Sequence, residues 1–331
     1  MFSRRTILLG LSACLLLTGC SVVSKVLPEK AITNVLSGRE GINGQVLVVK
    51  IDDTTQAHPQ IGLEDADIVY IEQVEGGLTR LAAVFSSVIP QRIGPVRSAR
   101  ISDIEILSQF GRVAFAYSGA QSKLLPVIAA ANLQDLGAQR QSPTIFTTDP
   151  NRAQPYAMVL RADLLMQHIK NKEFQIDSAK NVGFRFGPLP EGGTPTDKVV
   201  MHWPAATYSA TWSGDESRWL LSHNNSVNFA DSGVVLGPTT LVIQMVSITP
   251  SEYKDKIGGV TPFSQTVGTG KAYVLRNGQR FATTWSRASA EDGTTFSFAD
   301  GTVMNFDPGQ IWIALTDQEP DFTSPPVAKT K

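Results

Sequence analysis

The sequence has 331 residues, of which 42% are hydrophobic, and it carries 29 basic and 30 acidic side chains. This near balance of charge excludes the basic stripe that nucleic-acid binding requires, so we expect no nucleic-acid partner. A chain of this length can bury a sizeable core, and its two cysteines are too few for a disulfide framework.

Residues 1–19 have the features of a bacterial export signal. Two arginines come first, and residues 6–17 then form an apolar run that is too short to span a bilayer as a helix. The run ends in Leu-Thr-Gly-Cys at residues 17–20, which resembles the lipobox, where the chain is cut and the cysteine thiol is acylated. We therefore expect a lipoprotein that a lipid on Cys20 anchors to the outer face of the cytoplasmic membrane. The alternative is an ordinary signal peptide with a chance cysteine; a twin-arginine signal at residues 3–8 is a further possibility.

The rest of the chain divides by composition into four parts. Residues 20–41 lack a sustained pattern and predict a tether, and residues 317–331 are rich in proline, threonine and charge and predict a disordered tail. Between them, residues 42–185 alternate strand and helix signals, whereas residues 190–316 have mostly strand signals. The expected fold class is α+β or α/β, with a mixed-sheet N-terminal domain that carries helices and a β-rich C-terminal domain packed beside it.

In the first domain, apolar and β-branched runs predict strands at residues 45–51, 67–74, 78–86 and 113–117. Gly76-Gly77 lies between two of these runs and indicates a two-residue hairpin turn. Residues 102–110 predict a helix, in which Ser102 and Glu105 form a capping box and Gly111 follows the last turn. Further helices are expected at residues 122–131 and 161–172.

In the second domain, two dipeptides indicate hairpin turns between strand-like runs. These are Asn277-Gly278 and Asp300-Gly301, which favour the positive φ angles of tight turns. The expected strands are residues 241–248, 271–275, 280–285, 294–298 and 311–315.

Three motifs of the first domain resemble a known family. They are Pro-Gln-Ile-Gly-Leu-Glu-Asp-Ala-Asp at residues 59–67, Glu-Gly-Gly-Leu-Thr-Arg at 75–80 and Gly-Pro-Val-Arg-Ser-Ala-Arg at 94–100. With similar motifs in residues 267–313, they resemble the YerB-like lipoprotein family, whose members carry a domain of unknown function in two halves. The resemblance covers most of residues 45–316 and implies location and fold extent, but no reaction. One stretch differs from the family pattern, because the chain has Pro155-Tyr156-Ala157 where the family shows Pro-His-Asn.

The best candidate for a binding site is the segment before the expected helix. Arg97 and Arg100 flank the helix start, with Ser98 between them. Two guanidinium groups beside a helix N-terminus can clamp a phosphate or a carboxylate. The alternative is that both arginines only pair with acids of the same region, such as Asp67, Glu72, Glu75 or Asp103.

A second candidate is the group of acids around the first hairpin. With a two-residue turn, Glu75 and Arg80 would lie diagonally on one sheet face, close enough to touch. We interpret this pair as mainly structural, and we include both residues with Arg97, Ser98 and Arg100 as candidate ligand-binding residues. Glu72 would point to the other face, inside an otherwise apolar strand, where a carboxylate needs a partner. Glu72 and Asp103 are therefore the candidate catalytic residues, although strand acids are more often ion-paired than catalytic.

The four histidines are His58, His168, His202 and His223, and no two lie at metal-ligand spacing along the sequence. We therefore predict no metal site, and no motif indicates a cofactor.

Two hypotheses for function follow. In the first, an envelope lipoprotein binds an anionic cell-wall ligand or another envelope protein through Arg97 and Arg100. In the second, an envelope enzyme acts on a cell-wall glycan or phosphate polymer, with Glu72 or Asp103 as the catalytic group and the arginines as an electrostatic clamp.

Overall fold

The computed structural model describes residues 32–326. The predicted export signal and the lipid attachment point at Cys20 lie outside the described residues and stay predictions. Within residues 32–326, no helix combines the length and the apolar character needed to cross a membrane.

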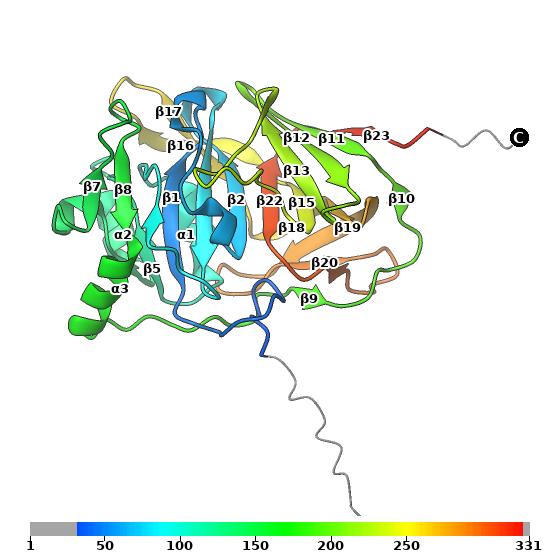
Figure 1. The fold of residues 1–331 in the computed structure, drawn as a ribbon, viewed down its shortest axis with the longest axis horizontal. Helices are drawn as coiled ribbons and strands as arrows, with labels where there is room; N and C mark the ends of the chain where they lie inside the picture. The colour runs from blue at the N-terminus through cyan, green and yellow to red at the C-terminus, as the bar shows by residue number, and fades with distance from the viewer. Residues whose placement is uncertain (1–31, 327–331) are drawn as a thin grey trace, which may run out of the picture. The chain divides into compact units, whose positions relative to one another are not determined.

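A large mixed sheet runs through the molecule (Figure 1). Its 11 strands include β20 (Thr295–Ser297), which pairs with β19 beside the main path. The order along the main path is β10 (Thr194–Pro195), β19 (Gln279–Arg287), β18 (Gly268–Arg276), β15 (Thr240–Met245), β22 (Ile311–Thr316), β2 (Ile68–Gln73), β3 (Thr79–Phe85), β1 (Leu47–Asp52), β5 (Val113–Ala116) and β6 (Leu133–Asp135).

The two halves of the chain meet inside this sheet. Strand β22 of the second half pairs in parallel with β2 of the first half, with Ile68 opposite Ile311. Both strands are buried on both faces, so each requires a strand neighbour on either side. The expected arrangement of two domains packed side by side is therefore replaced by one continuous sheet.

A second sheet of five strands was not predicted from the sequence. Its order is β14 (Ser226–Val227), β13 (Arg218–His223), β12 (Ala206–Ser213), β11 (Lys198–Trp203) and β23 (Asp321–Thr323). Strand β23 lies in the expected disordered tail, and it pairs with the edge of β11. The prediction of disorder is therefore wrong for this part of residues 317–331.

Shorter elements complete the described chain. The small sheets are β16 (Ile248–Lys254) with β17 (Val260–Ser264), β21 (Asn305–Phe306) with β9 (Arg185–Phe186), and β4 (Arg92–Ile93) with β8 (Met158–Arg161) and β7 (Phe146–Thr148). The helices are α1 (Ile101–Ser108), α2 (Leu125–Ala130) and α3 (Ala162–Asn171), with 3-10 turns at η1 (Thr55–Ala57), η2 (Leu63–Asp65), η3 (Glu75–Gly77) and η4 (Ala138–Arg140).

The large sheet separates two hydrophobic cores, one on each face. One core joins alternate residues of β1, such as Val49, to α3 and to the five-stranded sheet, where Tyr208 and Trp219 are buried. The other joins the intervening residues, such as Val48, to α1 and α2 and to strands of the second half. Each core draws on both halves of the chain. The architecture is strand-rich with mixed sheets, and it fits the α+β expectation only loosely.

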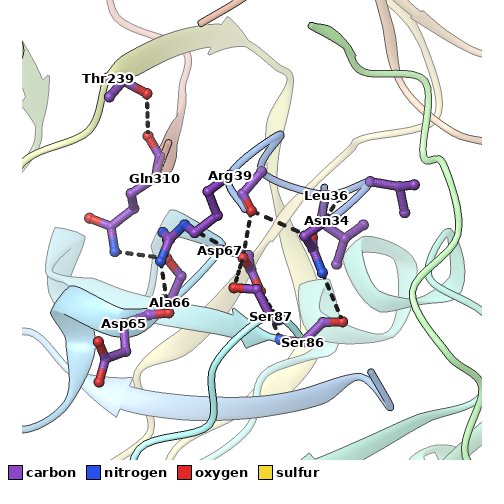
Figure 2. A network of polar contacts seen from close by, with 12 residues as sticks. Asn34, Leu36, Arg39, Asp65, Ala66, Asp67, Ser86, Ser87, Thr239 and Gln310 are labelled. Carbon is purple, nitrogen blue, oxygen red and sulfur yellow. Dashed lines mark hydrogen bonds and ion pairs between the residues drawn. The ribbon is translucent and has the colours of Figure 1, made fainter. Parts of the chain in front are cut away.

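The segment of residues 32–41 is packed, although the sequence predicts a tether there. Leu36 is fully buried, and the Ser37 hydroxyl donates to the Asp67 carboxylate over 2.6 Å. Figure 2 shows this network, in which Arg39 and Gln310 both donate to the carbonyl oxygen of Ala66, over 2.7 and 3.0 Å. The prediction of a tether is therefore wrong for the packed residues from Asn34 onward.

The first hairpin has a longer turn than the sequence predicts. Gly76 and Gly77 do adopt positive φ angles, but the turn η3 has three residues, and Val74 donates to the carbonyl of Leu78. This changes the register by one residue, so that Glu72 rather than Gln73 lies opposite Arg80. A shift of one residue moves a side chain to the other face of the sheet.

Helix α1 begins earlier than predicted, and a different side chain caps it. The Asp103 carboxylate accepts a hydrogen bond from the backbone N–H of Arg100 over 2.7 Å. Ser102 and Glu105, which we expected to cap the helix, instead bind the end of β17 and the segment that follows it. Ser102 accepts from the N–H of Ser264, and Glu105 accepts from the N–H groups of Thr266 and Val267.

Candidate functional site

One face of strands β1, β2 and β3 changes from apolar to charged along its length. Because side chains alternate between the faces, Lys50 and Asp52 of β1 lie on the same face as Val48. Glu72 and Arg80 lie opposite each other on this face, and Arg80 also lies opposite Asp52. Four charged side chains are thus collected where helix α1 begins.

Above these residues is a pocket of about 350 Å³. All five residues that we predicted to bind a ligand line it: Glu75, Arg80, Arg97, Ser98 and Arg100. The facing wall comes from the hairpin β16–β17 of the second half, through residues such as Tyr253 and Lys256. The pocket therefore lies between the two halves of the chain, and its volume is in the range of small-ligand sites.

Two of the arginines have carboxylate partners. Arg97 lies 2.5 Å from Asp52, and Arg100 donates to Glu75 through Nε and Nη2, over 2.8 and 2.7 Å. Burial alone would raise the pKa of Glu75, but the Arg100 guanidinium and the Thr261 hydroxyl hold it below its ordinary value. The local ion pairs that we considered as an alternative are thus present, and Asp52 is a partner that we did not predict.

Arg80 differs from the other two arginines. Its side chain donates to the carbonyl oxygen of Ser98 over 2.8 Å, and no carboxylate among residues 32–326 comes within 4.0 Å of its nitrogens. It is 9% exposed, and burial, followed by the charges of Arg100 and Arg97, lowers its pKa. Arginine keeps its charge in proteins, so the pocket contains a desolvated cation that no carboxylate of the described residues contacts directly.

The two candidate catalytic acids lie beneath the pocket and do not line it. Glu72 and Asp103 are fully buried, and both accept from the ammonium group of Lys50, which is 2.8 Å from Asp103. Burial and the Asp103 carboxylate raise the pKa of Glu72 to about 7. Neither acid can reach a molecule in the pocket, so the geometry gives no support to them as catalysts.

Three further points predicted from the sequence for this region need correction. Lys50 was missed, although a lysine inside a β-branched run must have a buried counter-ion, which is a signal that the sequence does contain. At the helix start, the Asp103 carboxylate takes the N–H group of Arg100, so that this group is not free for a ligand. Finally, Glu75 pairs with Arg100 instead of Arg80, as a result of the longer hairpin turn.

A second polar cluster lies on the opposite face of the same sheet. Asp53 directly follows β1 and is 3.3 Å from His58 and 3.9 Å from His223. This cluster was not predicted from the sequence, because the histidines are far apart in the chain. His202, by contrast, pairs with Asp321.

Known proteins share this architecture. Residues 32–175 match the family described as "Protein of unknown function (DUF3048) N-terminal domain", and residues 199–313 match the corresponding C-terminal domain. Over 73 residues the chain is 38% identical to "Putative lipoprotein YerB" of Bacillus subtilis (strain 168), a stretch that covers 22% of either protein. The crystal structure of the YerB protein from Bacillus subtilis matches with a TM-score of 0.74 and 19% identity, over 88% of this chain and 99% of that chain. At this identity the structural likeness shows a common fold. The chain belongs to the YerB-like family, which the two-part DUF3048 domain defines.

Proposed function

We propose that this protein is an exported, lipid-anchored envelope protein that binds an anionic ligand in the pocket of Arg80, Arg97 and Arg100. The ligand class is a phosphate or carboxylate group of a cell-wall polymer. The relative named as a lipoprotein and the motif before Cys20 support the anchor. The three converging guanidinium groups support the ligand class.

The observation that carries the proposal is the environment of Arg80. A buried cation without a carboxylate is costly, and a bound anion would offset that cost. Arg97 and Arg100 are held by Asp52 and Glu75, so their guanidinium groups are fixed in place before a ligand arrives. Fixed donors lose less entropy on binding, which favours recognition of an anion.

The charge of the pocket favours an anion over a cation. Its lining includes three arginines and Lys256, against the acids Glu75 and Asp255. Glu75 is neutralised by Arg100, and Asp255 accepts from backbone N–H groups of its own loop. Arg97 is likewise paired with Asp52, so one positive charge of the pocket is in excess, and an anion of one charge would balance it.

Co-sedimentation with purified cell-wall fractions tests the ligand class. One fraction keeps its phosphate-bearing polymer, and a second has lost it by acid treatment. We expect Arg97→Ala to weaken binding to the first fraction by about 10- to 100-fold, which corresponds to the loss of a charge-assisted hydrogen bond. Arg161→Ala is the matched control, because Arg161 is a surface arginine, paired with Asp163, that does not line the pocket.

Binding should also weaken as salt is raised, and less steeply for Arg97→Ala. Equal binding of both variants to both fractions, with unchanged melting temperatures, would reject the pocket as the binding site. If binding depends on Arg97 but survives removal of the phosphate polymer, the anion is a carboxylate.

The anchor has its own test. Mass spectrometry of the membrane-bound protein should show a chain that starts at Cys20 and carries a lipid, and Cys20→Ser should release it from the membrane. An intact N-terminus at Met1 would reject the lipoprotein assignment. Protease added to intact cells should digest the protein if it faces outward.

A further inference from the structure

The cluster around Asp53 lies on the face of the sheet opposite the arginine pocket. Its residues come from distant parts of the chain, because His58 follows η1 and His223 ends β13. One oxygen or nitrogen from each of Asp53, His58 and His223 lies within 4.8 Å of the others. The cluster therefore links the first half of the chain to the second half.

The carboxylate of Asp53 is fixed by neutral donors. The hydroxyl groups of Tyr208 and Thr79 donate to its two oxygens, each over 2.6 Å. Asp53 is 1% exposed, so its negative charge has almost no water to stabilise it. A buried carboxylate of this kind requires a cation, and hydroxyl donors alone do not supply one.

The hydrogen bonds of His58 direct its Nε2 toward this carboxylate. Its Nδ1 lies 2.9 Å from the amide oxygen of Asn228, which can only accept, so Nδ1 carries the hydrogen. Its Nε2 lies 3.1 Å from the amide nitrogen of Gln60 and 3.3 Å from Asp53. A proton on Nε2 would make an imidazolium paired with Asp53, and a metal ion would take the place of that proton. A partner such as Asn228 behind a histidine is typical of a metal ligand, because it fixes the tautomer and the ring.

His223 provides the second observation. It is 4% exposed, and its Nε2 is buried without a hydrogen-bond partner in the described part of the chain. This nitrogen lies 3.9 Å from the second oxygen of Asp53. A buried imidazole nitrogen without a partner, directed toward a carboxylate, is a free ligand atom.

We propose that Asp53, His58 and His223 bind one divalent transition-metal ion, and that Zn²⁺ fits the donor set. Two imidazole nitrogens and one carboxylate oxygen suit zinc, which leaves a fourth position for water. Ligand atoms at a tetrahedral zinc are about 3.4 Å apart. Here Nε2 of His58 lies 3.3 Å from one oxygen of Asp53 and Nε2 of His223 lies 3.9 Å from the other, and a small shift of either ring brings both nitrogens to a single oxygen.

The rings must turn for both nitrogens to meet one ion. The imidazoles of His58 and His223 are stacked, with centroids 4.6 Å apart and planes 8° from parallel. His58 has room to turn, because its side chain is 17% exposed and lines a neighbouring pocket of about 550 Å³ with Arg152 and Asp149. This pocket also gives a metal ion a path from the solvent.

Metal titration of the full-length protein tests this site. The protein is purified in detergent, stripped with a chelator and titrated with Zn²⁺ by calorimetry, and with Co²⁺ by visible absorption. We expect one ion per chain, and at least tenfold weaker binding in His58→Gln and in His223→Gln. The absorption bands of Co²⁺ report nitrogen and oxygen ligands directly, so they separate this site from loose surface binding.

His202→Gln is the matched control, because its histidine also faces an aspartate but lies at the surface. It should bind as the unchanged protein does. Zn²⁺ at about 100 times its Kd should raise the melting temperature of the unchanged protein by about 5 °C, but not that of His223→Gln. If His223→Gln fails to fold, the more exposed His58→Gln decides. Equal uptake of Zn²⁺ by the unchanged protein and the double variant His58→Gln/His223→Gln would overturn the proposal.

Discussion

Glu72→Gln should change how the stability of the protein depends on pH. In the folded protein Glu72 shares the single cation of Lys50 with Asp103, and all three side chains are fully buried. If both acids were ionised, Lys50 could neutralise only one of the two buried negative charges. Burial and the Asp103 carboxylate therefore raise the pKa of Glu72 from 4.5 to about 7.

The sign of the effect follows from comparing folded and unfolded chains. Below about pH 4.5 Glu72 is protonated in both states, so it causes no pH dependence. Between about pH 4.5 and 7 the unfolded chain loses this proton while the folded chain keeps it, so the free energy of unfolding falls. The full loss is about 3 kcal/mol and is reached above pH 7. Glutamine does not titrate, so the variant lacks this loss.

Urea unfolding at a series of pH values measures the effect. The free energy of unfolding of Glu72→Gln, relative to the unchanged protein, should rise by about 3 kcal/mol from pH 4.5 to pH 8. Glu216→Gln is the control, since Glu216 is half exposed and paired with Arg218, and its difference should stay nearly flat. A flat difference for Glu72→Gln would show that Glu72 is already ionised in the folded protein, and it would refute this account of the buried triad.

Three further predictions concern stability, each measured by urea unfolding. Leu36→Ala should lower the free energy of unfolding by about 2–5 kcal/mol, because Leu36 is fully buried in the segment that the sequence predicts as a tether. A loss under about 0.5 kcal/mol would instead support the prediction of an unpacked tether. Glu105→Ala should cost about 2–3 kcal/mol, because two backbone N–H groups lose their acceptor, and a neutral result would show that water replaces it. Lys271→Ala should change stability by less than about 0.5 kcal/mol, since its pair with Glu319 is largely exposed, and a larger loss would contradict this.

The main strands and helices of the first half could be predicted from local signals, such as continuous apolar, β-branched runs for the strands. The apolar run at residues 45–51 became β1, and residues 161–172 became α3. The turn at Asn277-Gly278 was also confirmed, with φ angles of 48° and 67°. In each case the determining interactions lie within a few residues of one another in the sequence.

The five-stranded sheet was missed, although it had a signal. Strands β11, β12 and β13 alternate between buried and partly exposed residues, as half-buried strands do. Histidine, serine and threonine occupy many of the outer positions, so the runs are less apolar than the strands that we predicted. The pairing of β2 with β22 had no local signal at all, because burial on both faces indicates an inner strand but does not identify its neighbours.

The arginine site was likewise predicted where its residues are close in sequence, and it was wrong where the strand register decides. The grouping of Arg97, Ser98 and Arg100 was predicted from one continuous motif, and Arg80 and Glu75 were added through the hairpin. The hairpin register was wrong by one residue, because a three-residue turn and a two-residue turn have the same glycine pair. That single residue decides whether Glu72 shares a face with Arg80, and so it decides which charges are buried together.

For Asp52 and Asp53, the sequence predicts the direction of each side chain but not the residues that it contacts. Adjacent residues at the end of a strand point to opposite faces, so the sequence alone places these two carboxylates in different environments. The contact partners of the two carboxylates depend on long-range packing. Asp52 pairs with Arg97 beside a pocket whose other wall is the hairpin β16–β17, and Asp53 faces His223 of β13. Both sites are completed by the second half of the chain, so the parallel pairing of β2 with β22 is the step that creates them.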